Sequence, residues 1–230
     1  MKFIKTLGKG LFFLSKFVLA ITFFFVFFYL LSLLQEKLFL PKDYRLWTSN
    51  YPLSRLIFIF ELYIIFLLFK SKFKIILNFA KRNKKWFYPA FALVNFLLLY
   101  AVLFNVSVIT ENRITNHSFL APQGKTYSYS DISSIDTGIY GKKLYFPFTH
   151  SAGDFYYKLI LKDGTTIYLF DSTGGTQDNR DVYEVIGELD GSFVSMGIGK
   201  TASLDNFELL EGSLDIEYSN KIKKVITNTK

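Results

Sequence analysis

Long apolar runs occupy the N-terminal half of the chain, and short alternating segments occupy the C-terminal half. The runs cover residues 12–34, 53–69 and 86–108. A membrane-spanning α-helix needs roughly 20 predominantly apolar residues, so the first and third runs have the required length. The pattern predicts a transmembrane domain over residues 1–109 and a soluble domain over residues 110–230.

The first run contains an uncharged stretch from Phe17 to Leu34, and the Lys16 side chain can extend to the membrane interface. A cleaved signal peptide is the alternative, but its apolar core is usually about 7–15 residues long. This run is longer and is followed by the polar residues 35–37. We therefore expect an uncleaved anchor.

The other two runs differ in how closely they match the composition of a membrane span. The third has no charged residue and begins with Trp86 and Tyr88, which suit the membrane interface. The second holds Arg55 near one end and Glu61 in its middle, so a re-entrant or surface segment is the alternative to a span. The loop between the first two runs carries Tyr44, Trp47 and Tyr51, which we expect at the outer interface.

Basic residues favour a span for the second run. Short segments rich in Lys and Arg stay in the cytoplasm, and both the N-terminal tail and the loop after run two are basic. Both can be cytoplasmic only if run two crosses the membrane. We therefore expect three spans, a cytoplasmic N-terminus and an extracytoplasmic C-terminal domain. The basic residues of the loop are Lys70, Lys72, Lys74, Lys81, Arg82, Lys84 and Lys85.

The same loop has apolar residues at helical spacing, at Phe73, Ile76, Leu77 and Ala80. An amphipathic basic helix binds an anionic leaflet, so we expect the basic loop to contact anionic lipids. A purely topological role for these charges is the alternative, and the two are compatible.

Charge separates the two halves of the chain. Residues 1–109 hold 15 Lys/Arg and three acids, whereas residues 110–230 hold 12 Lys/Arg and 16 Asp/Glu. The net charge of +8 comes from segments beside apolar runs and does not indicate nucleic-acid binding. The chain has no cysteine, which excludes disulfides, thiolate catalysis and Cys-based metal sites.

Alternating segments in the C-terminal half predict strands over residues 113–119, 126–130 and 155–161. Asp163-Gly164, between two apolar-rich runs, predicts a hairpin with a type I′ turn, which needs positive φ at both central residues.

Helical spacing follows the strands. It predicts helices over residues 178–189 and 215–226, and residues 171–177 are expected to form a loop that ends the β region. Strands followed by helices indicate an α+β fold or a small β-barrel with helices.

The segment Tyr127–Ile135, YSYSDISSI, is followed by a predicted hairpin and helix. This order resembles the bacterial pleckstrin-homology-like domains that are fused to transmembrane helices in Gram-positive membrane proteins. In the resemblance, Arg113-Ile114 opens the first strand, and the match covers residues 110–190. It implies a PH-like β-sheet or barrel and a non-enzymatic binding or assembly module. Some relatives are implicated in bacteriocin immunity or envelope stress. The chain from Gly191 onward departs from the minimal domain.

Glu61 is the most distinctive candidate residue. An ionisable group inside a membrane is costly unless paired, and such groups are functional candidates. At 1.5 Å per residue, Glu61 and Asn95 both lie about 12 Å from the cytoplasmic ends of their runs, and Thr22 falls near the same layer. A Thr22–Glu61–Asn95 cluster can bind a cation, relay a proton or only lock three helices together.

Other motifs indicate no chemistry. Gly197–Thr201 resembles the end of a phosphate-binding loop, but Val194 stands where a Walker motif needs Gly, so an ordinary turn is expected. His117 and His150 share no ligand spacing and are expected at the surface. We expect no catalytic residue, metal site or cofactor.

These patterns predict a non-enzymatic multi-pass protein of the cell membrane whose outer domain binds a protein or peptide. One alternative is a structural subunit of a larger membrane complex. Another is a small ion- or proton-handling oligomer built around Glu61.

Overall fold

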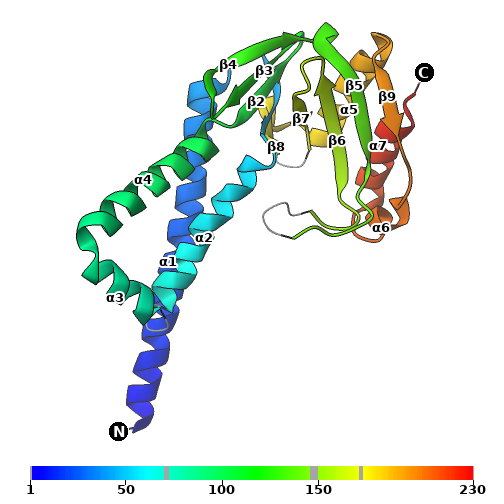
Figure 1. Ribbon diagram of the computed structural model, residues 1–230. Helices are drawn as coiled ribbons and strands as arrows, with labels where there is room; N and C mark the ends of the chain where they lie inside the picture. The colour runs from blue at the N-terminus through cyan, green and yellow to red at the C-terminus, as the bar shows by residue number, and fades with distance from the viewer. Residues whose placement is uncertain (1, 70–72, 146–149, 171–172, 230) are drawn as a thin grey trace. The chain divides into compact units, whose positions relative to one another are not determined.

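The chain forms two compact units in the computed structural model (Figure 1). The helical unit comprises Met1–Lys37 and Leu56–Leu103, and the α+β unit comprises Leu38–Arg55 and Phe104–Lys230. The boundary therefore differs from the one expected at residue 110, because a segment from the first loop belongs to the second unit. The structure describes residues 2–69, 73–145, 150–170 and 173–229.

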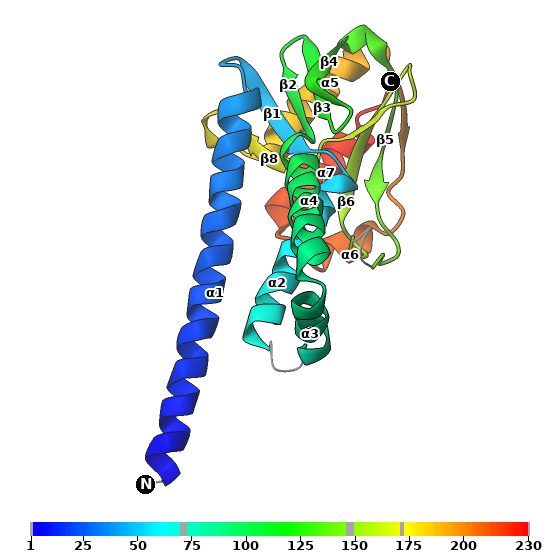
Figure 2. The ribbon, with the colours of Figure 1, turned by 60° about the vertical axis from the view of Figure 1, so that its left-hand side comes forward.

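Apolar helices make up the helical unit. Ring contacts join α1 to α2 through Phe27 and Phe60, with centroids 5.1 Å apart, and α2 to α4 through Tyr63 and Phe91, at 5.8 Å. Helix α3 connects α2 with α4 (Figure 2). The helices are α1 (Lys2–Phe39), α2 (Phe58–Leu68), α3 (Lys74–Arg82) and α4 (Lys84–Leu103).

Two described helices are long and apolar enough to cross a membrane, by length and composition: Leu14–Phe39 and Lys84–Leu103. The second run instead forms a 3₁₀ helix, η1 (Leu53–Ile57), followed by α2, which has only 11 residues. Three spanning helices are thus not found among the described residues. The third run is also shorter than expected, because the chain leaves the helix after Leu103 and becomes a strand at Val106.

Two open sheets form the β part of the α+β unit (Figure 1). Sheet A has the order β4-β3-β2-β1-β8, and sheet B has the order β7-β6-β5-β9. The described strands form no closed barrel. Their bounds are β1 (Tyr44–Ser49), β2 (Val106–Thr110), β3 (Arg113–Ser118), β4 (Ala121–Ser128), β5 (Ile132–Ile139), β6 (Phe155–Leu161), β7 (Thr166–Tyr168), β8 (Thr173–Thr176) and β9 (Gly199–Ala202).

Strand β1 lies inside sheet A, between β2 and β8. Its Trp47 is buried, at 2% exposure, so the expected interfacial position of this residue is wrong. The indole covers Gly174 on β8, where an added Cβ would lie 2.4 Å from the ring. The absence of a Cβ at Gly174 leaves room for the indole, and the segment expected to form a loop contains the edge strand β8, which pairs with β1.

One main core joins both sheets and the C-terminal helices. Sheet A contributes Leu46 and Ile109, sheet B contributes Tyr157 and Leu159, and α5 contributes Phe193. A smaller cluster on sheet A comprises Trp47, Val106 and Val108, with Phe39 and Leu40 packed against it. The C-terminal helices are α5 (Val182–Ser195), α6 (Phe207–Glu211) and α7 (Ile216–Thr227).

Several sequence predictions hold in this unit, with local corrections. The expected helices correspond to α5 and α7, but α5 begins later because Asp178 is left-handed, with φ 57°, and Asp181 caps the helix. The Asp163-Gly164 hairpin forms, but only Gly164 has positive φ. The turn is therefore not type I′. The Asp163 carboxylate accepts hydrogen bonds from the Thr165 N–H and from Tyr127 Oη.

Candidate functional site

The three residues of the expected intramembrane cluster lie on α1, α2 and α4. Thr22 is exposed, and the Asn95 side-chain amide donates to the Phe91 carbonyl of its own helix at 2.7 Å. The Glu61 side chain lies outside the described residues. Counted from the ring contacts at 1.5 Å per residue, Glu61 is about 3 Å from the level of Asn95 and about 6 Å from that of Thr22. The cluster stays a prediction, with Asn95 the closer partner in depth.

The basic segment after α2 forms the expected helix, α3. Its Lys74, Lys81 and Arg82 are exposed, as are Ile75 and Phe79, which are 85% and 59% exposed. Of the apolar residues expected to share one face, Ile76 is exposed, Phe73 and Leu77 are half-buried and Ala80 is buried, so the exposed apolar side chains lie partly at other positions. Of the other basic residues of this loop, Lys84 and Lys85 are exposed on α4, and Lys70 and Lys72 lie outside the described residues.

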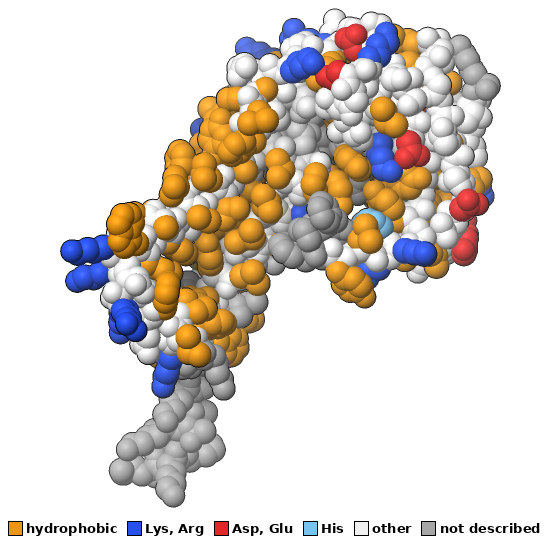
Figure 3. All heavy atoms as spheres, in the orientation of Figure 1, with side chains coloured by type: hydrophobic (Ala, Val, Ile, Leu, Met, Phe, Trp, Pro, Cys, Tyr) orange, Lys and Arg blue, Asp and Glu red, His pale blue; other side chains and the backbone are white. Residues whose placement is uncertain are grey.

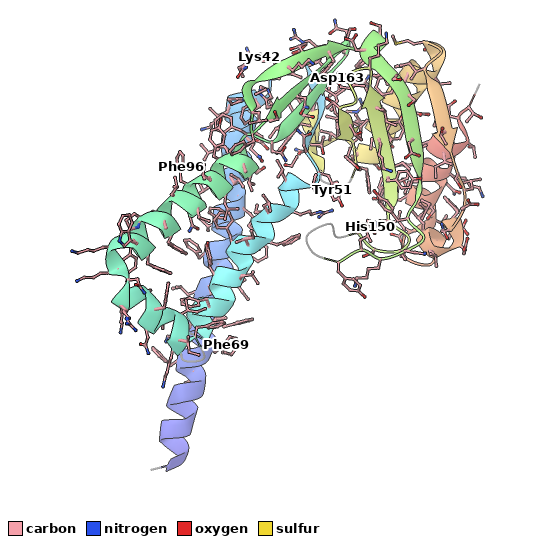
Figure 4. All side chains as sticks on the ribbon, viewed as in Figure 1. Lys42, Tyr51, Phe69, Phe96, His150 and Asp163 are labelled. Atoms are coloured by element: carbon pink, nitrogen blue, oxygen red, sulfur yellow. The ribbon has the colours of Figure 1, made fainter. Side chains whose placement is uncertain are left out.

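The α+β unit contains an open cavity of about 630 Å³ with a charged lining. Its basic residues come from the start of β1 and from the segment before α5, and Lys42 follows the C-terminal end of α1 (Figure 4). Ionic groups of both signs line one hollow, which suits a charged ligand. The lining residues are Lys42, Asp43, Arg45, Glu111, Gln177 and Arg180.

Glu188 on α5 holds the two arginines of this cavity. The carboxylate forms ion pairs with Arg45 and Arg180, so it bridges β1 and the segment before α5. Hydrogen bonds from Arg180 lower the pKa of Glu188, and the charge of Arg45 adds to the effect. Both arginines are therefore fixed at the cavity, whereas no ion pair involves Lys42 among the described residues.

A buried ionic network lies deeper in the unit, around Asp190 on α5. The Asp190 carboxylate accepts from Lys200 Nζ at 2.6 Å, from Tyr157 Oη at 2.8 Å and from Asn228 Nδ2 at 2.7 Å. Lys200 also donates to the carbonyls of Val225 and Asn228. The Lys200 and Asp190 side chains are only 3% and 1% exposed. We call these residues the Asp190 network.

The Asp190 network ties β6, β9 and α5 to the end of α7. Lys200 stands within Gly197–Thr201, which was expected to be a turn, but residues from Gly199 onward form β9, parallel to β5. Burial lowers the pKa of Lys200, and the Asp190 carboxylate opposes that effect. Burial, followed by the Asp190 charge, raises the pKa of Tyr157. Every charged group has a partner, so the arrangement is that of a structural clamp.

A polar cluster joins the ends of β1, β2 and β3. Asn50 Nδ2 donates to Asn116 Oδ1 at 2.6 Å, and Ser107 Oγ donates to Asn50 Oδ1 at 2.6 Å. Asn105 Nδ2 donates to the Asn50 carbonyl at 2.5 Å, and the Asn50 N–H donates to the Asn105 carbonyl at 2.9 Å. This junction cluster closes sheet A where the chain leaves and re-enters the α+β unit.

His117 beside this cluster is buried, so its expected surface position is wrong. Its ring lies 4.5 Å from that of Phe39, and Nδ1 is 2.9 Å from the Pro122 carbonyl oxygen. His150 is half-buried and stacks on Tyr140 at 3.7 Å. Both rings have packing roles, and the absence of a metal or cofactor stays a prediction.

The chain thus combines two helices of membrane-spanning length with an α+β unit, which indicates a membrane-associated protein. Comparison with known proteins gives no match among family models, curated proteins or solved structures. The relation to PH-like domains therefore stays a resemblance.

Proposed function

We propose that this chain is a non-enzymatic, membrane-anchored binding protein, and that its α+β unit offers the charged cavity to a charged segment of a protein or peptide partner. The cavity is the observation that supports this proposal. It holds fixed arginines beside the acids Asp43 and Glu111, and its volume of about 630 Å³ lies within the range typical of ligand sites.

The residues of the cavity suggest how such a partner is recognised. A carboxylate on the partner can compete with Glu188 for Arg45 and Arg180, because guanidinium groups bind carboxylates through paired hydrogen bonds. Lys42 lines the same cavity and supplies a further cation. Asp43 and Glu111 can accept from a basic group on the same partner. Mixed charge therefore favours a segment with both signs over a simple anion.

For topology, we propose a cytoplasmic N-terminus, three crossings and an extracytoplasmic α+β unit. The basic side chains of α3 support a cytoplasmic position for this helix. The segment Leu53–Leu68 runs about 26 Å if its 3₁₀ turn and α-helix are in line. That length approaches the roughly 30 Å of a hydrocarbon core, which supports a crossing over a surface segment.

Site-specific photo-crosslinking in intact cells tests the binding proposal. A photoreactive residue at Gln177, in the cavity, should give a discrete adduct of higher mass. The matched control is Ser130, an exposed residue of the same unit outside the cavity lining, which should give none. Charge reversal by Arg180→Glu should remove the Gln177 adduct.

Two results would count against the proposal. One is the absence of a discrete adduct at Gln177, and the other is equal adducts at Gln177 and Ser130. Adducts only at Phe96, which points away from α4 and is 64% exposed (Figure 4), would instead support a structural subunit that packs through its helices. Exposed apolar side chains gather over α4 and α2 (Figure 3), as expected for either lipid or helix contact.

A further inference from the structure

The turn between β3 and β4 is apolar where polar residues are usual. Ser118 pairs with Ala121, so Phe119 and Leu120 are the two central residues of the hairpin. Two-residue hairpin loops favour Asn, Asp and Gly because of their positive φ, and neither residue has positive φ here. Leu120 is 89% exposed. Neither the backbone conformation of the turn nor packing in the core therefore accounts for a leucine at this position.

The Phe119-Leu120 turn lies at the end of sheet A where the chain connects to the helices. Ser49, at the end of β1, pairs with Val106, at the start of β2. Ser107 pairs with Asn116 near the end of β3, so the following turn emerges beside that junction. The α+β unit ends its first segment at Arg55 and begins its second at Phe104. The chain segments that lead to and from residues 56–103 therefore both leave sheet A at this end.

Charge differs between the two ends of these strands. Residues 46–54, 104–110 and 114–124 contain no Lys, Arg, Asp or Glu, and Arg55 and Lys125 directly follow the first and third of these segments. At the opposite end, the turn from β2 to β3 carries Glu111 and Arg113. Charged groups are costly to move out of water into lipid, whereas Leu and Phe gain from that transfer. The Phe119-Leu120 turn itself therefore carries no charge that would oppose contact with lipid.

We propose that the Phe119-Leu120 turn inserts into the bilayer at the boundary between headgroups and acyl chains, and so orients the α+β unit on the membrane. This inference rests on the proposed membrane anchor. One turn gives little binding energy alone, but the tether makes the contact intramolecular and raises its effective concentration. Exposed Leu and a neighbouring Phe suit such shallow insertion.

Single-cysteine labelling tests the inference in the full chain, because the protein has no cysteine of its own. Leu120→Cys is labelled with an environment-sensitive fluorophore in vesicles of phosphatidylcholine and phosphatidylglycerol. Asn112→Cys is the matched control, because it is exposed in the opposite turn of β3. The strand between the turns spans about 20 Å. Spin-labelled lipids with the label high on the acyl chain serve as quenchers.

The label at Leu120 should lose fluorescence with the spin-labelled lipid and shift to shorter wavelength, and the label at Asn112 should do neither. Equal quenching at both positions, or none at either, overturns the inference while the protein stays in the vesicles. Extraction of the protein from the vesicles at alkaline pH instead overturns the membrane anchor. Matching thermal unfolding of the two labelled proteins and the parent shows that the substitutions leave the fold intact.

Discussion

The α+β unit should fold without the helical unit once its two segments are joined. Removing residues 1–37, deleting residues 51–104 and linking Asn50 to Asn105 through Asn-Gly gives a chain that starts at Leu38. The Asn50 N–H already donates to the Asn105 carbonyl at 2.9 Å, so the two ends form a ladder pair. Asn-Gly is the preferred loop for closing such a pair with a type I′ turn.

The fragment 110–230, which the sequence pattern favours as a domain, should not fold. It lacks β1 and β2, which bury five large apolar side chains to 2% exposure or less. Burying one such side chain contributes roughly 1.5–3 kcal/mol. The missing burial is then roughly 7–15 kcal/mol, as large as the about 5–15 kcal/mol that keeps a whole domain folded. The five residues are Leu46, Trp47, Val106, Val108 and Ile109.

Urea denaturation followed by circular dichroism compares the two proteins. The joined chain should give a cooperative transition, and residues 110–230 should give a random-coil spectrum without one. The joined chain retains Trp47 and loses Trp86, the other of the two tryptophans. Its fluorescence therefore reports on sheet A alone, and both probes should give the same midpoint. A cooperative transition of equal midpoint in fragment 110–230 would refute the assigned strand order.

A pair of glycine substitutions in the joined chain provides the internal control. Gly174→Ala places a Cβ 2.4 Å from the Trp47 ring, so it should lower the urea midpoint. Gly191→Ala, on α5, meets no atom within 4 Å and should raise stability by up to about 1 kcal/mol through helix propensity. Equal effects of the two substitutions would contradict the packing of Trp47 on β8.

Three further predictions concern topology, the membrane and the Asp190 network. A reporter fused after Lys230 should be active outside the cytoplasm and one at Asn78 inside it; cytoplasmic activity at the C-terminus would exclude three crossings. If Glu61 only locks helices, Glu61→Gln should be nearly silent and Glu61→Leu should cost about 0.5–2 kcal/mol in thermal stability, whereas ion handling requires both variants to fail in growth assays. Lys200→Met should cost about 3–5 kcal/mol by leaving Asp190 without its cation, and adding Asp190→Leu should restore part of that loss; additive losses in a double-mutant cycle would show that the pair is not coupled.

Elements with a strong local pattern could be predicted from sequence. The strand β6 has the predicted bounds, Phe155–Leu161, because its buried and half-buried residues alternate without interruption. Helix α7 was found to within a residue because its buried positions, including Ile222 and Ile226, repeat at helical spacing. In both elements the local pattern and the tertiary packing agree, so no long-range information was needed.

The division into units could not be predicted, because it depends on pairing across the helices. Strand β2 follows α4 almost at once. All its residues are buried, so burial does not alternate along it, and its sequence resembles the end of the preceding apolar run. Strand β1 precedes the second run and contains Trp47, a residue type that is typical of the membrane interface. Only the pairing of Trp47 with Val108 identifies both as central strands. Apolar residues close to a membrane segment are therefore ambiguous between lipid and core.

The candidate sites were missed for the same physical reason. Lys200 lies in a glycine-rich stretch typical of a turn, and its partner Asp190 stands in the middle of a helix. The helix predicted from the sequence ended at residue 189, whereas α5 continues to Ser195, so Asp190 was not recognised as an acid inside a helix. Arg45 and Arg180 are 135 positions apart, and only the fold brings both to Glu188.

Charged and uncharged segments alternate along the sequence, and sheet A places them at opposite ends of its strands. Along β1 the charged residues come before Leu46, and the uncharged stretch follows. Strand β2 ends, and β3 begins, at the turn that carries Glu111 and Arg113. Antiparallel pairing therefore gathers Arg45 and Glu111 at one end, near the cavity, and the uncharged segments at the other. An uncharged end carries no penalty for approaching lipid, and a charged end remains in water. If the turn at Leu120 contacts the bilayer, Arg45 and Glu111 of the cavity lie at the opposite end of the same sheet.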